Sequence, residues 1–109
     1  MDIETRLHHR ILVDWYAFIK TFQGSITGRT RDISVDGVCI FSPMEPELGE
    51  SFKIVLKPPG VKSIPVIAKL VWSGNLDVED KAVFGMGIRF RAISPEDRQY
   101  IASLVEKEK

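Results

Sequence analysis

The sequence is poor in cysteine and histidine and has no excess of charge of either sign. It holds one cysteine, two histidines, 15 Lys plus Arg and 15 Asp plus Glu, so its formal net charge at pH 7 is zero. Cys39 has no partner for a disulfide, and no Cys/His spacing indicates a zinc site. Because the charge is balanced, the molecule as a whole has no general attraction for nucleic acid or an acidic membrane. Any anion-binding site must therefore be local.

Long apolar runs are also absent. No stretch approaches the roughly 20 apolar residues that a membrane-spanning helix needs. Residues 1–10 are polar and lack the apolar segment of a signal peptide. We therefore expect a cytoplasmic protein without membrane insertion. The chain of 109 residues, 44% hydrophobic and 28% charged, has the size and composition of one globular domain.

Alternation of apolar and polar residues is the main structural signal in the first 90 residues. A period of two is typical of β-strands. The pattern predicts strands over residues 11–19, 25–33, 38–41, 52–57, 64–72 and 84–90. In the fifth strand, every second residue from Ile64 to Trp72 is expected on one face, and residues 73–81 are expected to form a loop. Six short strands in succession predict a barrel or sandwich.

The end of the chain has the pattern of one helix. Ser94 is a suitable N-cap residue, Pro95 fits the first helical position, and two acidic residues follow. The apolar residues after them recur at helical spacing: Tyr100, Ile101, Leu104 and Val105. We also expect Cys39 to be a buried small apolar residue, and Trp15 and Trp72 to pack in the core or at the barrel mouth.

Two short motifs have the chemistry of an anion site. Arg6 and Arg10 precede the first strand, and an arginine fork can grip a phosphate or the O6/N7 edge of guanine. Asp32 follows at the end of the second strand, where its carboxylate can accept from both N1–H and N2–H of guanine. Ser34 adds a hydroxyl, and Gly37 lets the backbone take a positive φ or approach a ligand closely. Each motif alone is also an ordinary sequence feature; together they indicate a site for a guanine nucleotide.

Taken together, the motifs resemble a known family. The segment Arg6-Leu-His-His-Arg10, followed by Asp32-Ile-Ser-Val-Asp-Gly37, is similar to the RxxxR and [D/N]xSxxG signature of PilZ domains. Gly49, Val71-Trp72, the strand at residues 85–90 and the closing helix also fall where that family has them. The resemblance implies an all-β fold, a six-stranded antiparallel PilZ-type barrel over residues 11–109. It also implies a flexible N-terminal arm, residues 1–10, and one C-terminal helix.

The resemblance further implies a function. PilZ domains bind the bacterial second messenger cyclic di-GMP, and Arg6 and Arg10 would contact guanine Hoogsteen edges and phosphates. Asp32 and Ser34 would meet the guanine and the sugar-phosphate, and Gly37 would shape the turn. The chain would then be a stand-alone receptor that changes conformation and signals to a downstream protein, in motility, exopolysaccharide production or virulence. Cyclic di-GMP is the one ligand implied, with no cofactor, no metal and no nucleic-acid partner.

Several alternatives stay open from the sequence. A nucleotide-independent adaptor with the same fold would bind its protein partner equally well without Arg10 and Asp32. A binder of single-stranded nucleic acid is a third reading, although the neutral charge speaks against it. The two histidines at positions 8 and 9 have no further ligands near them, and no nucleophile–base pair indicates an enzyme. The sequence decides neither between one nucleotide and a stacked pair, nor between a monomer and a weak homodimer.

Overall fold

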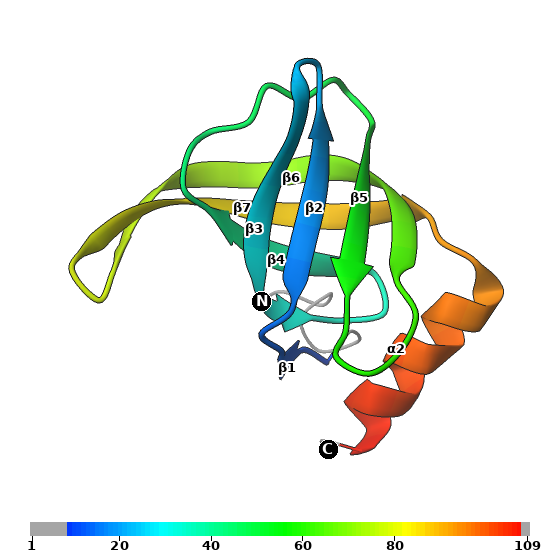
Figure 1. Ribbon diagram of the computed structural model, residues 1–109. Coiled ribbons are helices and arrows are strands. Elements are labelled where there is room, and N and C mark those ends of the chain that lie inside the picture. Colours follow the sequence, from blue (N-terminus) through cyan, green and yellow to red (C-terminus); the bar gives the residue numbers. More distant parts are fainter. Residues whose placement is uncertain (1–8, 108–109) are drawn as a thin grey trace.

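The computed structural model describes residues 9–107 and places six antiparallel strands in a closed barrel (Figure 1). The strands are β2 (Tyr16–Thr21), β3 (Gly24–Ile33), β4 (Gly37–Ser42), β5 (Phe52–Lys57), β6 (Ile64–Val78) and β7 (Lys81–Ala92). Around the barrel the order is β3-β2-β5-β6-β7-β4, and pairing of β4 with β3 closes the ring. The predicted six-stranded antiparallel barrel is confirmed.

The strand expected over residues 11–19 is split in two. A short strand, β1 (Ile11–Leu12), pairs with the end of β3, and the chain then crosses to β2. The break is held by the buried hydroxyl of Thr30, which donates to the Val13 carbonyl at 2.6 Å and accepts from the Trp15 amide at 2.8 Å. Ile11 and Trp15 still face inward, so the predicted alternation holds across the break.

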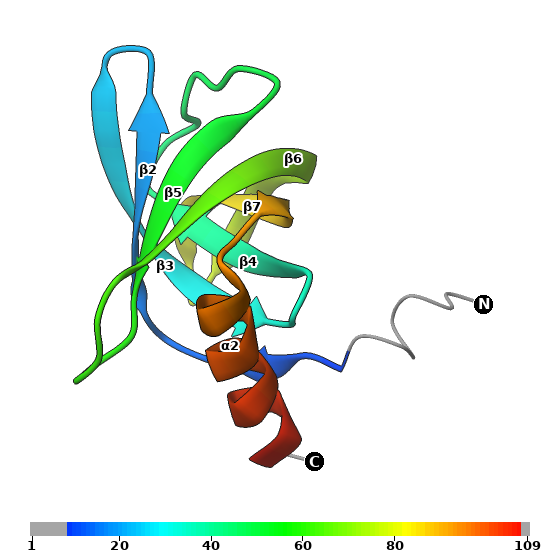
Figure 2. The ribbon, with the colours of Figure 1, turned by 90° about the vertical axis from the view of Figure 1, so that its right-hand side faces the viewer.

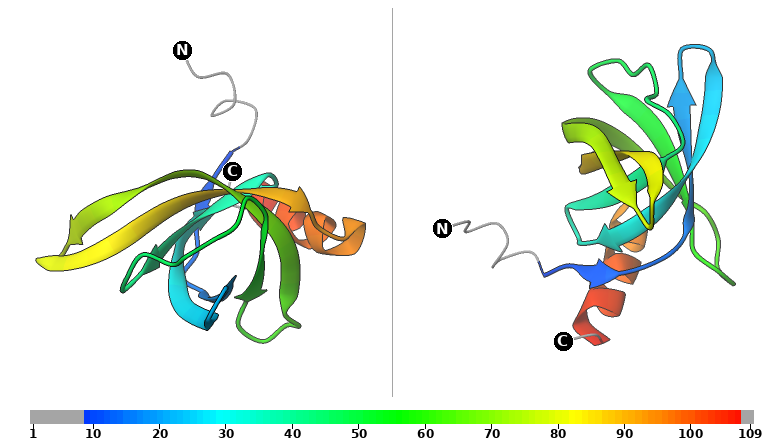
Figure 3. Two further views of the ribbon diagram at one scale, coloured as in Figure 1. Left: turned by 90° about the horizontal axis from the view of Figure 1, so that it is seen from above. Right: turned by 90° about the vertical axis from the view of Figure 1, so that its left-hand side faces the viewer.

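A long hairpin of β6 and β7 projects beyond the barrel, on the left in Figure 1 and in the left panel of Figure 3. The loop expected over residues 73–81 is wrong, because β6 continues to Val78 and β7 begins at Lys81. Only Glu79 and Asp80 lie between them, with φ of 51° and 65°. Positive φ at both central residues is the pattern of a type I′ turn, which normally uses Asn or Gly. Acidic residues at this turn gave no sequence signal.

A β-bulge changes which residues of β6 face the core. The register with β7 shifts between Leu70 and Trp72, so Val71 is an extra residue on its strand. Ile64, Val66 and Ala68 point inward as expected. The expectation for Trp72 is wrong, because the bulge turns it to the outer face, where 47% of the residue is exposed.

The barrel interior is filled by aliphatic side chains and covered at one end by the helix. The residues with no exposed surface include Ile19, Ile33, Ile40, Ile54, Leu56 and Met86. The helix, α2 (Pro95–Lys107), buries Ile101 and Val105 against this core (Figure 2). Its N-cap is the expected Ser94, whose Oγ accepts from the Asp97 amide at 3.0 Å. Within residues 9–107 no helix is long and apolar enough to cross a membrane.

Candidate functional site

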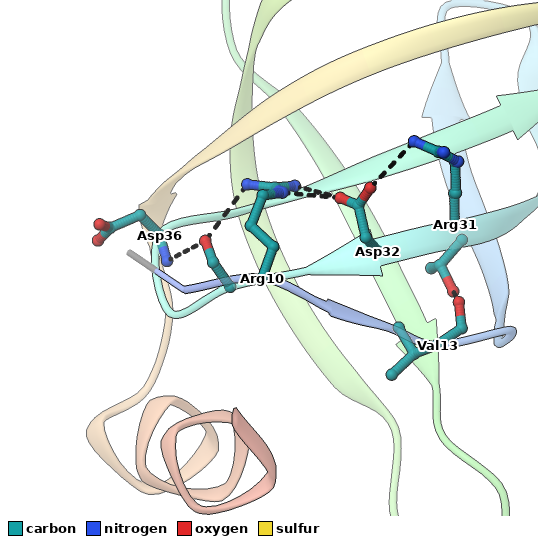
Figure 4. A network of polar contacts seen from close by, with 7 residues as sticks. Arg10, Val13, Arg31, Asp32 and Asp36 are labelled. Carbon is teal, nitrogen blue, oxygen red and sulfur yellow. Dashed lines mark hydrogen bonds and ion pairs between the residues drawn. The ribbon is translucent and has the colours of Figure 1, made fainter. Parts of the chain in front are cut away.

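The predicted site residues that the structure describes gather where β1, β3 and β4 meet (Figure 4). Asp32 lies near the end of β3, and Gly37 is the first residue of β4. Between them the Ser34 amide donates to the Gly37 carbonyl at 2.9 Å, which closes the turn. The Ser34 hydroxyl accepts from the Asp36 amide at 3.2 Å, an interaction typical of serine in turns. The turn is therefore held by one backbone hydrogen bond and by the Ser34 hydroxyl.

Arg10 joins the first motif to the second. Its Nε donates to Oδ1 of Asp32 at 2.7 Å, and its Nη2 lies 2.7 Å from the same oxygen. Its Nη1 reaches Oγ of Ser34 at 3.4 Å. Hydrogen bonds between charged groups are short and strong, and the Asp32 side chain is only 15% exposed. The structure thus brings together Arg10, Asp32 and Ser34, whereas Arg6 lies outside the described residues.

Gly37 has its place because the backbone of β7 comes close. A Cβ on Gly37 would collide with the carbonyl oxygen of Ile88, and the φ of Gly37 is not among the positive ones. Next to it, the Asp36 carbonyl accepts from the Phe90 amide at 2.8 Å. The glycine is thus required by close packing of the turn against β7. Of the two reasons considered from the sequence, close approach applies here.

The turn is also joined to the helix. Nη2 of Arg98, in the first turns of α2, lies 2.9 Å from Oδ1 of Asp36. Both side chains are partly exposed, at 48% and 31%. On the other side of the site, Arg31 lies 3.5 Å from the second oxygen of Asp32. The turn therefore has charged contacts both to α2 and along β3.

Trp72 extends the site along the outer surface of the barrel. Asp32 pairs with Cys39, Cys39 with Gly87, and Gly87 with Trp72, so the four residues form one row across β3, β4, β7 and β6. We call this row the outer shelf. Three strand spacings separate its ends, or about 14 Å. A Cβ on Gly87 would overlap the indole ring, so the ring of Trp72 lies directly on the bare backbone.

The outer shelf was not predicted from the sequence. The expectation for Trp72 was packing in the core or at the barrel mouth, and that expectation holds only for Trp15. One signal was present: Gly85 and Gly87 alternate on the strand that pairs with the tryptophan segment. Paired glycines on a strand leave room for a neighbouring ring. The bulge that moves Trp72 to the outer face has no comparable signal.

Cys39, within the outer shelf, is affected by the charges of the site. Burial raises the pKa of its thiol above the ordinary value of 9.0, and the carboxylate of Asp32 adds to the rise. Arg10 and Arg31 act in the opposite direction. The expected burial of Cys39 is confirmed. Among residues 9–107 no group of three His, Cys, Asp or Glu side chains could hold a metal ion, and His8 lies outside that range.

Comparison with known families gives a match over almost the whole chain. The profile of the PilZ domain family matches residues 4–107. That range includes both motifs and the helix. No curated protein matches the chain.

Solved structures with the same fold are distant in sequence. The PilZ domain with c-di-GMP of YcgR from Escherichia coli superimposes with a TM-score of 0.75 at 16% identity, covering 92% of this chain and 88% of that one. The Bacillus subtilis inhibitor of motility (MotI/DgrA) superimposes with a TM-score of 0.76 at 15% identity, covering 93% of this chain and 49% of that one. The PlzA protein of Borreliella burgdorferi in complex with c-di-GMP has a TM-score of 0.70 at 14% identity, covering 91% of this chain and 50% of that one. The chain thus spans about half the length of the latter two, and at these identities the similarity shows the fold.

Proposed function

Because this chain belongs to the PilZ domain family, we propose that it is a receptor for cyclic di-GMP that signals to a protein partner. The observation that carries the proposal is the contact of Arg10 with both Asp32 and Ser34. Two motifs that lie 22 residues apart meet at one point and offer a cation, a carboxylate and a hydroxyl. The same fold in a YcgR domain and in PlzA was solved with c-di-GMP, which supports this ligand.

Each group has a task that suits its chemistry. The planar fork of Arg10 can grip a phosphate or the O6/N7 edge of a guanine. The Asp32 carboxylate can accept from N1–H and N2–H of guanine, which adenine cannot supply. We assign Ser34 to the sugar-phosphate, Gly37 to the shape of the turn and Arg6 to a second cation in the same clasp.

The outer shelf offers a place for a base at some distance from the phosphate grip. The half-exposed indole of Trp72 is backed by Gly87 and cannot sink further into the sheet. Stacking of a nucleobase on an aromatic ring stabilises a complex by about 1–3 kcal/mol. We propose that one guanine is held near Asp32 and that Trp72 is available to another base of the bound nucleotide.

Binding would have to change the partners of Arg10. Its guanidinium now shares its hydrogen bonds between Asp32 and Ser34, so a nucleotide must share or replace that pair. We propose that residues 1–10 act as one arm, which moves with Arg10 when the pair opens, and that residues 11–109 stay as the barrel. The Asp36–Arg98 ion pair offers a route from the turn to α2, where a partner protein could detect the change.

We propose no catalytic role for the site. The only hydroxyl among its described motif residues is that of Ser34, which contacts the Arg10 guanidinium and the Asp36 amide. Neither group is a general base, so neither contact activates the Ser34 oxygen as a nucleophile. The chemistry of these side chains fits binding.

Isothermal titration of the purified protein tests the proposal. Cyclic di-GMP should bind, whereas GTP and cyclic di-AMP should bind at least tenfold more weakly. Arg10→Ala should abolish the heat of binding of cyclic di-GMP. Arg29→Ala is the matched control, because Arg29 is exposed to a similar extent and pairs with Asp14 instead of Asp32. No heat with the wild-type protein at tens of micromolar would leave the nucleotide-independent adaptor as the better account.

A further inference from the structure

A second cationic surface covers the outer face of β3, β2, β5 and β6, toward the viewer for the first three strands in Figure 1. We call it the basic sheet face. The outward positions lie in residues 16–20, 25–31, 53–57 and 65–69, where the four strands run side by side. They carry Lys20, Arg29, Arg31, Lys53, Lys57 and Lys69. None of the outward positions in these four segments holds an Asp or Glu.

The lysines of this face are not neutralised. Arg29 is paired with Asp14 at 2.8 Å, and Arg31 approaches Asp32 at 3.5 Å. In contrast, within residues 9–107 the four lysines form no ion pair, and all four are exposed. Apart from Asp14 and Asp32, which contact the two arginines, the acidic residues include groups in the segments at 45–50 and 77–80. The four lysines are therefore a local concentration of unpaired positive charge.

Apolar side chains lie among the cations of the same face. Tyr16, Phe18 and Ile67 are 52%, 36% and 42% exposed. Tyr16 lies opposite Lys57 on the next strand, and Ile67 lies opposite Lys53, so these two residues each have a lysine beside them. Phe18 lies opposite Val55. Lysine stems can lie along apolar surface while the ammonium groups stay in water. The face thus has exposed apolar side chains interspersed with cations.

We propose that the basic sheet face docks the protein on an anionic lipid surface. Its cations spread over three strand spacings, about 14 Å, which suits a plane of charge better than a point ligand. The unpaired cations are lysines, which act as mobile point charges and are attracted to anionic headgroups without a fixed geometry. Tyr16, Phe18 and Ile67 would reach the boundary between headgroups and acyl chains.

Two other polyanions fit the face less well. A single nucleic-acid strand needs free aromatic faces for stacking, whereas the guanidinium of Arg29 already lies 4.2 Å from the centre of the Tyr16 ring. An acidic protein surface is a poorer match because lysine is depleted in protein interfaces, where arginine is preferred. Lipid docking does not require the residues of the nucleotide site, so the proposal stands apart from the proposed function.

Vesicle co-sedimentation without nucleotide tests the proposal. Vesicles of phosphatidylcholine with phosphatidylglycerol should bind the protein, vesicles of phosphatidylcholine alone should not, and added salt should release it. Each cation near an anionic membrane strengthens binding about fivefold. Lys53→Glu/Lys57→Glu should therefore weaken binding by at least about 25-fold. Lys81→Glu/Lys107→Glu changes the net charge equally on exposed sites off this face and should bind as the wild type does.

Several outcomes of these experiments would contradict lipid docking. Equal loss in both double variants, or equal binding to neutral vesicles, would overturn the proposal. Tighter binding of a thymidine oligonucleotide or of polyglutamate than of anionic vesicles, at matched anion concentration, would overturn it in favour of nucleic acid or an acidic protein. Circular dichroism melts show whether the glutamate variant folds. If it does not, Lys53→Gln/Lys57→Gln removes the charges with less repulsion and should still weaken binding about 25-fold.

Discussion

The indole ring of Trp72 lies on the backbone of Gly87, with no side chain between the ring and strand β7. The two residues are directly paired, and the bulge before Trp72 puts this contact on the outer surface. A rigid aromatic face thus stands in the row that leads to Asp32. The missing side chain at position 87 is what keeps the ring flat against the sheet.

A methyl group at position 87 should disturb this contact. We expect Gly87→Ala to displace the indole and to lower the free energy of unfolding by about 1–3 kcal/mol, as overpacking does. Gly74→Ala is the matched control, because a Cβ on Gly74 in the same hairpin meets no atom within 4 Å. Urea unfolding measures both variants. Equal stability of the two would show that the ring has room to move.

Trp72 should also report and strengthen nucleotide binding. We expect cyclic di-GMP to quench the emission of Trp72, whereas Trp15 is only 7% exposed and gives a constant background. Loss of one base stack of about 1–3 kcal/mol predicts that Trp72→Ala raises Kd by about 5- to 150-fold. Trp72→Phe keeps a ring and should retain most of the affinity. A normal Kd for Trp72→Ala would remove the indole from the site.

The strands and the helix were predictable because their residues follow simple periods. The core positions alternate, as in Phe52, Ile54 and Leu56 of β5, and each of these three is buried. The N-cap at Ser94 is a local signal that needs no tertiary context. Such features depend on neighbours in the sequence, so the sequence alone indicates them.

The features that the sequence did not predict depend on pairing across the sheet. The long hairpin turns at Glu79 and Asp80, whose positive φ is imposed by the two strands that they join. Trp72 faces outward because of a register shift with β7, which no local period encodes. In the candidate site, the motif spacing suggested that Arg10 and Asp32 act together, but only the fold shows that they contact each other directly.

The ion pair between Arg98 and Asp36 should contribute little to stability. Pairs between exposed side chains stabilise by about 0–1 kcal/mol, so Arg98→Ala should change the free energy of unfolding by less than about 1 kcal/mol. Its effect should instead be local, because it releases α2 from the turn. Hydrogen exchange of the first amides of α2 should become faster. Lys62→Ala, which breaks the longer and more exposed pair with Glu96 in the first turn of the same helix, serves as the control and should change the exchange of these amides less.

Thr30 should matter far more than its neighbour on the same strand. The residue is only 4% exposed. Its hydroxyl accepts a hydrogen bond from the Trp15 amide and donates one to the Val13 carbonyl. Thr30→Val would leave those groups without their partner, which costs about 1–3 kcal/mol. Thr27→Val makes the same substitution on the exposed face of β3 and is the control. It should change the free energy of unfolding by no more than about 0.5 kcal/mol. Thermal melts that fail to separate the two would show that water replaces the hydroxyl.

Cys39 should make the free energy of unfolding fall at alkaline pH. Burial, aided by Asp32, raises the pKa of the folded thiol above the ordinary value of 9.0, so the folded state favours the protonated form. The resulting stability is fully present below the unfolded pKa and is lost as pH rises through the folded pKa. Other groups also titrate in this range, so the comparison must be made with a variant that lacks the thiol.

Urea unfolding of the wild type and Cys39→Ala, at steps from neutral pH to above the folded pKa, makes that comparison. The wild type should be the more stable at neutral pH, since the alanine leaves space beneath the outer shelf. The difference should then shrink as pH rises past 9.0, because only the wild-type unfolded chain gains from releasing this proton. A difference that stays constant over the whole range would mean that the thiol has the same pKa folded and unfolded. Burial beside Asp32 would then have no effect on its ionisation.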